Sequence, residues 1–371
     1  MISKASRTDL KRFPPVSVII LNHNGLAYMG EAALRECLDS VIECEYPNLE
    51  IIFVDNGSSD NSLLFVEHNY RDKIAVVKID RNLGFSEGFN EGIRASSGEY
   101  LALLSNDMVV DRNWLKPVVK LMKSDQGIGL AGCKRLAYGT TTLLDGIGAD
   151  LYLCGRVKSI GEGEVDRGQY DANMDNLGFI GGAMIIRRRT IEQVGLFDPV
   201  LFIYSEDVDL CFRIRKAGYK VVYVYDAVLW HRSSATLSGL SRDALTRAFI
   251  GFLANRNRIR TNLIHFRLRR LFSAFLIDFV WFAIYPNSQF KISLLKAYAW
   301  NLRHIGVTLK KRLEIGPSPP YGCKYGVQLS LLSTLQAHMR KKRAATERPT
   351  FEITSETTTG VSPTIRNVQD F

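Results

Sequence analysis

The sequence is 371 residues long, with 46% hydrophobic and 23% charged residues, which is an ordinary balance for a globular protein with a sizeable core. Its six cysteines are scattered without a CxxC pair, so we expect neither a zinc site nor a disulfide framework, and this usage fits a reducing compartment. The net charge is +10, and the first 15 residues contain no apolar run of the kind that a secretory signal requires.

Residues 15–135 alternate short apolar runs with stretches of helical spacing. Strands are expected at 16–21, 49–56, 74–80, 99–107 and 128–136, and helices at 30–44, 60–70, 86–98 and 112–125. Continuous apolar strands separated by helices predict an α/β fold with a mostly parallel, Rossmann-like sheet sandwiched by helices. Ligands of such sheets bind at the carboxyl ends of the strands, and the ends here are polar: "NHNG", "DNGSSD", "DRNLG" and "SNDM".

Residues 136–240 have a different character. The stretch 141–166 is rich in Gly and predicts short strands and loops. "LGFIGGAMIIRR" at 177–188 predicts a buried strand with a Gly-Gly break, "EDVDLCFRIRKAG" at 206–218 an amphipathic helix, and "YKVVYVYDAVLWH" at 219–231 a strong strand.

Residues 241–345 are helical in pattern and basic, with 19 Lys and Arg against three Asp and Glu. Their longest apolar run, 271–285, is short for a membrane span, which needs about 20 residues. Arginines lie on or near one helical face of 256–270, and interfacial aromatic residues follow: Trp281, Phe282, Tyr285 and Trp300. The pattern predicts an amphipathic helical extension on an anionic membrane surface, peripheral and on the cytoplasmic side. A homodimer interface is an alternative, and nucleic-acid binding is disfavoured because no motif for it accompanies the charge.

The remaining parts are terminal. Residues 1–14 are expected to form an N-terminal extension, and the Thr/Ser/Pro-rich residues 346–371 a disordered tail. The predicted organisation therefore has a globular domain at 15–240, made of two halves (15–135 and 136–240), followed by the helical extension.

Six segments occur in an order that is similar to family-2 glycosyltransferases: "VSVIILNHNG", "IIFVDNGSSD", "NLGFSEGFNEGI", "LLSNDMVV", "GGAMIIRR" and "YSEDVDLCFRIRKAGYKVVYV…LWH". The match covers about residues 16–235, and the subgroup that it resembles contains rhamnosyl- and galactofuranosyltransferases of cell-surface glycan assembly. The resemblance implies the GT-A fold, a nucleotide-sugar donor such as a UDP- or dTDP-sugar, a divalent cation and inversion at the anomeric carbon.

The first polar strand ends are candidate nucleotide contacts. The carboxylate of Asp55 can accept from the imide N–H of uracil or thymine, or from ribose; an Asx-turn is the alternative. Asn22 and Asn24 would flank the same base, although strand-end polarity explains them equally well. Asn106, the neighbour of Asp107 at the end of the fourth strand, is a further candidate cofactor contact.

Two further segments are candidates for the donor site. In "NLGFSEGFNEG", Gly84 permits close backbone approach, Asn82 and Asn90 supply amide groups, and a helix beginning near Ser86 would turn its N-terminus toward a diphosphate. The pair Gly182 and Ala183 resembles the small pair that lines the donor-sugar pocket in the family, with a strand bulge as the alternative.

The family normally places a D-x-D motif where this sequence has Ser105, Asn106 and Asp107. Asp107 matches the last acid and is the predicted metal ligand, with Ser105 in place of the first acid. One carboxylate suffices for Mg²⁺, since this ion keeps several waters and takes phosphate oxygens from the substrate. His231 is a candidate further ligand, which would favour Mn²⁺ over calcium; a structural hydrogen bond is the alternative.

Three acids in "YSEDVDL" are candidates for the base that deprotonates the acceptor hydroxyl. The family resemblance selects Asp207, with Glu206 beside it. Acids are also favoured at a helix start by the macrodipole, but that explains only one of Glu206, Asp207 and Asp209. Arg213 is expected to be a structural ion-pair partner on the same helix.

The sequence therefore predicts an inverting glycosyltransferase, with hexosyl or rhamnosyl transfer as the reaction, and leaves two rival functions open. A nucleotidyltransferase would need a Gly/Arg/Lys-rich first loop, and "LNHNGLAYMG" has no Lys or Arg. A catalytically inactive, membrane-bound partner of an active transferase is supported by Ser105 alone. The predicted ligands are a nucleotide sugar, a lipid-linked or glycan acceptor and an anionic membrane, with no nucleic acid.

Overall fold

A computed structural model describes residues 13–178, 182–232 and 244–316. These residues belong to one unit, Met1–Gln328. The second unit, Leu329–Phe371, lies outside the described residues, as do the predicted tail at 346–371 and all but the last two residues of the predicted N-terminal extension.

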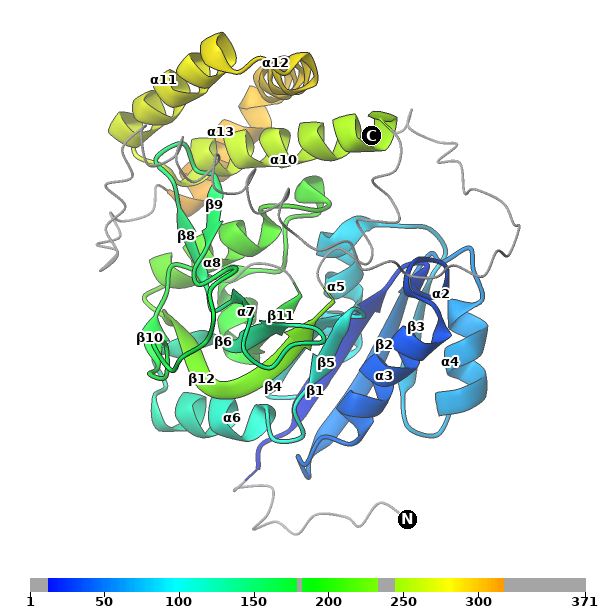
Figure 1. The fold of residues 1–371 in the computed structure, drawn as a ribbon. Coiled ribbons are helices and arrows are strands. Elements are labelled where there is room, and N and C mark those ends of the chain that lie inside the picture. Colours follow the sequence, from blue (N-terminus) through cyan, green and yellow to red (C-terminus); the bar gives the residue numbers. More distant parts are fainter. Residues whose placement is uncertain (1–12, 179–181, 233–243, 317–371) are drawn as a thin grey trace. The chain divides into compact units, whose positions relative to one another are not determined.

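The strands of the main sheet are β1 (Val16–Asn22), β2 (Leu49–Asn56), β3 (Ala75–Ile79), β4 (Tyr100–Ser105), β5 (Met108–Val110), β6 (Ile128–Ala137), β7 (Leu144–Gly146), β10 (Met174–Asp175), β11 (Ala183–Arg187) and β12 (Lys220–His231). Their order is β10-β12-β6-β11-β4-β1-β2-β3, with β5 paired to β12 and β7 to β6 (Figure 1). A separate pair consists of β8 (Ala149–Leu151) and β9 (Val157–Ser159).

The pairing confirms the predicted mostly parallel sheet. Strands β4, β1, β2 and β3 are parallel to one another, and β6 is parallel to β12. Strand β11 is antiparallel to both β4 and β6, so it joins the two parallel groups. The sequence pattern did not indicate this reversal, because an apolar run has the same appearance in either direction.

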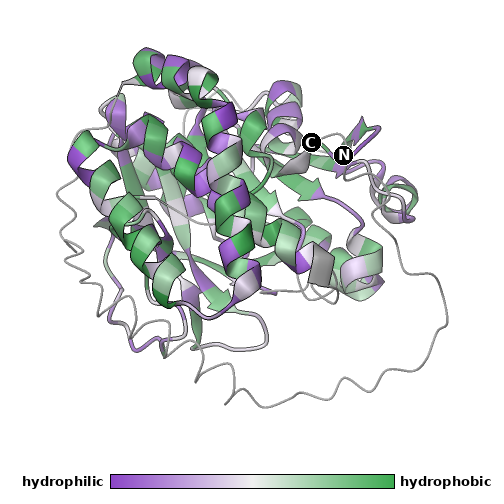
Figure 2. Cartoon of the chain, turned by 90° about the horizontal axis from the view of Figure 1, so that it is seen from above, coloured by the Kyte–Doolittle hydropathy of each residue, from purple (hydrophilic) through white to green (hydrophobic). Residues whose placement is uncertain are grey.

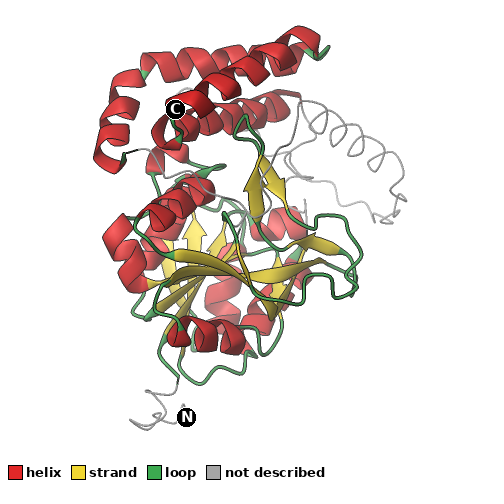
Figure 3. Cartoon of the chain, turned by 90° about the vertical axis from the view of Figure 1, so that its left-hand side faces the viewer, coloured by secondary structure: helices red, strands yellow, loops and turns green. Residues whose placement is uncertain are grey.

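The helices are α2 (Gly25–Met29), α3 (Glu31–Ile42), α4 (Ser62–Tyr70), α5 (Gly84–Ala95), α6 (Leu115–Ser124), α7 (Arg188–Val194), α8 (Glu206–Lys216), α10 (Ala244–His265), α11 (Leu268–Ile284), α12 (Ser288–Arg303) and α13 (Ile305–Ile315), with a short 3₁₀ helix η1 (Pro199–Leu201). Helices lie on both sides of the sheet (Figure 3). The core is correspondingly double: Val18 and Ile20 pack with α3 and α6, whereas Ile19 packs with α5 and α8. Burial of both strand faces explains the continuous apolar runs.

The C-terminal helices pack against the sheet domain and against one another. Helix α10 contacts α8, α12 and α13, and no break between units occurs near residue 240, where the change of composition suggested a boundary. Arg256, Arg258 and Arg260 are buried in this packing. Their predicted exposure on a basic face is therefore wrong, because these side chains bind protein groups instead of lipid.

Among the described residues, no helix is both long and apolar enough to cross a membrane. No disulfide joins the cysteines in this part of the chain.

Candidate active site

The polar ends of β1, β2 and β4 meet at one edge of the sheet, as predicted. Asn22 is in register with Asp55 on the adjacent parallel strand. Its Nδ2 donates to Asp55 Oδ1 over 3.3 Å, and its Oδ1 accepts from Nδ2 of Asn106 at 2.6 Å. All three side chains are buried. The three predicted nucleotide contacts therefore form one hydrogen-bonded row under this edge.

Asp55 and Asn24 hold the loop that follows β2. The backbone N–H of Ser58 donates to Asp55 Oδ2 at 3.3 Å, so the turn contact considered as an alternative for Asp55 is present. Asn24 adopts a left-handed conformation with φ 53°, and its Oδ1 accepts from the backbone N–H of Ser59 at 2.7 Å. Asn tolerates this region because its short polar side chain bonds locally. These contacts give Asp55 and Asn24 a structural role, and their nucleotide contacts remain predictions.

A residue that the sequence did not single out, Asn56, joins β2 to the start of α5. Its Nδ2 donates to Gly84 O at 2.9 Å and to Asn82 Oδ1 at 3.2 Å, and its Oδ1 accepts from Leu83 N at 2.9 Å. Asn82 Oδ1 also accepts from Gly84 N at 2.8 Å. Asn82 and Gly84 therefore lie beside the polar strand ends.

Helix α5 begins at Gly84, two residues before the expected start, and its first turn meets Phe202. A Cβ on Gly84 would lie 2.4 Å from Phe202 Cδ2, and Gly84 has φ +77°. Ser86 N donates to Phe202 O at 3.1 Å. This N–H was expected to face a diphosphate, and it is instead bonded to the loop that precedes α8.

Asn90 has a packing role that differs from the predicted nucleotide contact. Its Nδ2 donates to Phe197 O at 3.0 Å and to Glu87 Oε2 at 2.7 Å, while its Oδ1 accepts from Phe197 N at 3.0 Å. Both amide hydrogens are used and the side chain is buried, so this residue fastens α5 to the chain before η1. The expected donor contact of Asn90 is corrected accordingly.

The small pair Gly182 and Ala183 lies against the end of β4. Ser105 N donates to Gly182 O at 2.8 Å, and a Cβ on Gly182 would lie 1.9 Å from Ser105 Oγ. Gly182 has φ +56°, and β11 begins after it, with Ala183 paired to Leu104. The glycine thus permits β11 to reach β4 immediately before Asn106 and Asp107, and it precedes the strand instead of forming a bulge within it.

The two predicted metal ligands are adjacent. His231 Nε2 lies 3.4 Å from Asp107 Oδ2, and the other ring nitrogen, Nδ1, lies 2.9 Å from Asp145 Oδ2. Burial disfavours the protonated ring, but Asp107 and Asp145 outweigh it and raise the pKa of His231 to about 9. Asp145 follows no recognisable motif in "LLDGIG", so the sequence did not reveal it.

The donor set fits a hard divalent cation. Within the described residues, the buried Oδ1 of Asp107 has no hydrogen-bond partner. A carboxylate that bonds the remote nitrogen of a histidine is a common support for a metal-binding imidazole, and Asp145 occupies that position. No cluster of three or more His, Cys, Asp or Glu suited to a metal occurs in residues 13–178, 182–232 and 244–316, so the remaining ligands would be water and donor phosphate.

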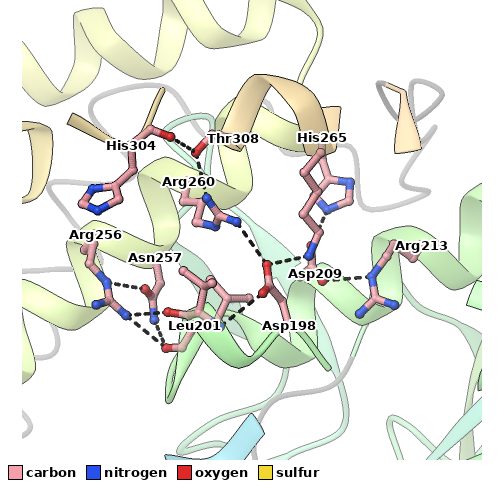
Figure 4. Close-up of polar contacts among 12 residues, drawn as sticks. Asp198, Leu201, Asp209, Arg213, Arg256, Asn257, Arg260, His265, His304 and Thr308 are labelled. Carbon is pink, nitrogen blue, oxygen red and sulfur yellow. Dashed lines mark hydrogen bonds and ion pairs between the residues drawn. The ribbon is translucent and has the colours of Figure 1, made fainter. Parts of the chain in front are cut away.

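The three acids of α8 are all buried but differ in environment. Asp209 lies 2.9 Å from Arg213 Nε and 2.8 Å from His265 Nε2. Burial opposes its ionisation, but Arg213 and His265 outweigh burial and hold the pKa of Asp209 well below its usual range. Asp209 is therefore a structural acid that ties α8 to α10, and the structural role expected for Arg213 is confirmed (Figure 4).

The pKa of Glu206 is shifted in the opposite direction, because Glu206 is buried and its charged neighbours are acids. Burial and the neighbouring charges of Asp207 and Asp209 raise the pKa of Glu206 well above its usual range. Asp207 Oδ1 accepts from Val208 N at 2.7 Å, a local contact of the kind that the helix start favours. Glu206 therefore favours the protonated form beside Asp207, the predicted base.

The loop at 201–205 that precedes these acids has an unusual backbone. Phe202, Tyr204 and Ser205 have φ of 59°, 74° and 69°. Positive φ in non-glycine residues is costly and persists when the surroundings impose it. Asn257 of α10 supplies this constraint, since its Nδ2 donates to Leu201 O at 2.5 Å (Figure 4). The same Nδ2 donates to the carbonyls of Ile203 and Tyr204 at 2.8 and 2.9 Å.

Neighbouring residues of α10 strengthen the same attachment. Arg256 Nη2 donates to Val200 O at 2.9 Å, and Arg260 Nη2 lies 3.3 Å from Asp198 Oδ2. Lys311 of α13 also binds Asp198, at 2.5 Å. The C-terminal helices thus shape the loop before α8, a role that the sequence did not indicate.

These contacts connect the candidate residues through the fold. Asn56 binds Gly84, Gly84 abuts Phe202, and Phe202 precedes the acids of α8. On the other side, Asn22 binds Asn106, which is followed by Asp107. Residues 17–195 match the family model described as Glycosyl transferase family 2. This part of the chain is therefore similar to family-2 glycosyltransferases.

Two curated relatives of this chain have names that refer to the synthesis of polysaccharides. Poly-beta-1,6-N-acetyl-D-glucosamine synthase of Staphylococcus epidermidis is 25% identical over 219 residues, which are 57% of this chain and 50% of that protein. O-antigen biosynthesis protein RfbC of Myxococcus xanthus is 27% identical over 210 residues, which are 55% of this chain and 16% of that protein. The chain thus spans half or less of the length of these relatives.

Solved structures share the fold. GalNAc-T7, crystallised with UDP, GalNAc and Mn²⁺, has a TM-score of 0.55 at 16% identity, covering 84% of this chain and 60% of that chain. A second structure is mannosyltransferase PcManGT from Pyrobaculum calidifontis in complex with GDP-Man and Mn²⁺. It has a TM-score of 0.50 at 16% identity, and the match covers 90% of this chain and 86% of that chain. The described part of the chain therefore has the predicted GT-A fold, with a mostly parallel sheet flanked by helices.

Proposed function

We propose that this protein is an inverting glycosyltransferase that moves a sugar from a UDP- or dTDP-sugar to a lipid-linked glycan acceptor in cell-surface polysaccharide assembly. The observation that carries the proposal is the pair Asp107 and His231, supported by Asp145 at the sheet edge where Asn22, Asp55 and Asn106 meet. A rhamnosyl or galactofuranosyl specificity is part of the same proposal. The names of the relatives above support the polysaccharide setting.

In this proposal the strand-end row at Asn22 and Asp55 binds the nucleotide, and Gly182 and Ala183 leave room for the donor sugar. Asp107 and His231 would hold Mg²⁺ or Mn²⁺, which supplies positive charge to the departing diphosphate. Asp107 contributes the buried oxygen that has no hydrogen-bond partner in the described residues, and Asp145 orients the imidazole. Binding the ion requires His231 to lose the proton that its two carboxylates favour.

Asp207 is the proposed general base. An acceptor hydroxyl that attacks the anomeric carbon must lose a proton, and a positioned carboxylate removes it. Burial and the neighbouring acids raise the pKa of Glu206, which makes Asp207 the better candidate for the base. The backbone at 201–205, held by Asn257, sets the position of Asp207 in the first turn of α8.

The test combines binding and turnover. UDP, dTDP and GDP, with and without Mn²⁺, are first compared by thermal shift, and we expect stabilisation by a uridine or thymidine diphosphate that increases with Mn²⁺. Nucleoside diphosphate release is then measured from UDP-N-acetylglucosamine, UDP-galactose and dTDP-rhamnose. Asp207→Asn should retain the thermal shift and lose about 10²–10⁴ of the turnover.

The matched control is Asp226→Asn, since Asp226 is an exposed acid on β12. It should retain both the thermal shift and the turnover. Near-normal turnover in Asp207→Asn would refute the base assignment, and the absence of stabilisation by every nucleotide would refute the transferase proposal.

We also propose that the protein is attached peripherally to an anionic membrane on the cytoplasmic side, where a lipid-linked acceptor is accessible. The excess of basic residues after residue 240 supports this location. A homodimer through the same helices is the competing arrangement.

A further inference from the structure

Helix α11 has an apolar face that the rest of the described chain leaves exposed. Six of its large hydrophobic side chains are between 40% and 77% exposed: Leu268, Phe272, Phe275, Leu276, Phe279 and Ile284. Those at positions 268, 272, 275 and 279 are three or four residues apart, so they share one side of the helix. Figure 2 views the molecule from the side on which α11 and α12 lie in Figure 1, and hydrophobic residues are prominent there. An apolar patch of this extent marks an interaction surface.

The opposite side of α11 packs against the rest of the protein. Leu271, Ala274, Asp278 and Trp281 are buried. Asp278 lies 2.7 Å from Arg258 Nη2 of α10 and accepts from Tyr298 Oη of α12 at 2.7 Å. This buried attachment fixes which face of α11 points outward. The helix therefore lies along the protein surface with its apolar side presented to a partner.

The charges exposed on the C-terminal helices indicate which kind of partner the apolar face binds. Arg267 and Arg269 are exposed at the start of α11, and Lys296, Arg303 and Lys310 are exposed on α12 and α13. Residues 244–316 contain only two acids, Asp278 and Glu314, and Asp278 is buried. A second copy would bring two cationic surfaces together, which costs electrostatic energy. An anionic lipid surface instead offers both apolar chains and negative headgroups.

We propose that the outward face of α11 inserts into the headgroup layer of an anionic bilayer, with Leu268, Phe272 and Phe279 reaching the acyl chains. Arg267 and Arg269 then contact lipid phosphates. This inference deepens the peripheral location proposed above and specifies its surface, and it does not depend on the transfer chemistry.

The proposal narrows which arginines bind lipid. Sequence spacing placed the arginines of 256–270 on the membrane, yet Arg256, Arg258 and Arg260 are bonded inside the protein. Arg267 and Arg269 of the same stretch are exposed. In this proposal α11 contacts the membrane, and α10 connects α11 to the 201–205 loop. A lipid-linked acceptor would thereby meet the base from a membrane whose position is set by α11.

The test is sedimentation of the full chain with phosphatidylglycerol vesicles and with phosphatidylcholine vesicles, without nucleotide sugar. Phe272→Ser combined with Phe279→Ser should weaken binding to phosphatidylglycerol vesicles at least about tenfold, because two large apolar groups no longer insert. The matched control is Leu64→Ser, which changes a 63% exposed apolar residue on α4 and should bind as the wild type does. Raising the salt concentration should weaken wild-type binding, since phosphate contacts are screened.

Size-exclusion chromatography with light scattering is run on the same proteins. Wild-type protein that stays unbound with phosphatidylglycerol vesicles overturns the proposal, as does a double variant that binds as well as Leu64→Ser. A dimer that dissociates in the double variant, without vesicle binding by the wild type, assigns the face to a second copy and also overturns it. A lower melting temperature of the double variant, with vesicle binding unchanged, assigns the face to internal packing and overturns it as well. None of these results alters the Asp207→Asn test, which is made without membranes.

Discussion

Replacing Asp209 by Asn removes a charge that two other side chains share within the packing of α8 and α10. Asp209 and Arg213 are four residues apart and lie 2.9 Å from each other, with side chains 0% and 7% exposed. His265 Nε2 bonds Asp209 from the other side at 2.8 Å. Burial lowers the pKa of His265. Asn retains the shape of the side chain but leaves the Arg213 guanidinium buried without its counter-charge.

The expected cost at pH 7 is about 3–5 kcal/mol of unfolding free energy, the range for breaking a buried pair by removing one partner. The pH dependence follows from the depressed pKa of Asp209 in the folded state. Such a carboxylate contributes stability above its unfolded pKa of about 4, and the contribution is lost as the pH falls toward the folded pKa. The gap between wild type and Asp209→Asn should therefore be full at neutral pH and shrink below about pH 4.

The assay is urea unfolding followed by circular dichroism between pH 3 and pH 8. Glu31→Gln is the matched control, since Glu31 and Arg35 are also four residues apart and lie 2.7 Å from each other, but are 61% and 42% exposed. The control should unfold at the same urea concentration as the wild type, because solvent screens that pair. Equal stabilities of Asp209→Asn and Glu31→Gln would refute the assignment of Asp209 as a buried structural acid, and so would a gap that grows in acid.

Three further outcomes are expected. Asp145→Asn should weaken Mn²⁺ binding, measured by calorimetry, by about 10–100-fold through the orientation of His231, and unchanged affinity would contradict the metal assignment. Asn257→Ala should lower turnover and destabilise the protein by about 1–3 kcal/mol, since carbonyls at 201–204 lose their donor; equal turnover would show that the loop needs no such constraint. Gly84→Ala should lower the melting temperature, because its Cβ would overlap Phe202 and φ +77° disfavours any side chain; an unchanged melting temperature would mean that α5 and the 201–205 loop are not in close contact.

Much of the sheet edge was predictable because strand ends are local features. Apolar runs identified β1, β2 and β4, and parallel strands of one sheet must end at the same edge. The convergence of Asn22, Asp55 and Asn106 followed from that rule. The position of Asp107 beside His231 required the family resemblance, because β12 lies far from β4 in sequence.

Other residues were not predictable because their roles depend on distant partners. Asn90 was expected at the nucleotide, but its amide is saturated by the backbone of Phe197, which no local pattern indicates. Asp145 and Asn257 lie in no quoted motif, and Asn56 lies in "IIFVDNGSSD" without a role assigned to it; each acts by bonding a group from another element.

The sequence by itself determined the alternation of strands and helices, the polar strand ends and the basic character of the C-terminal helices, because periodicity and charge are properties of neighbouring residues. Tertiary structure alone decided which charges face solvent. The spacing of Arg256, Arg258 and Arg260 predicts an exposed basic face. These side chains are nevertheless buried, because Val200, Asp278 and Asp198 supply their partners from other elements. The physical reason is that burial and ion pairing are properties of contacts between distant segments, and helical spacing gives the side of a helix but not what covers it.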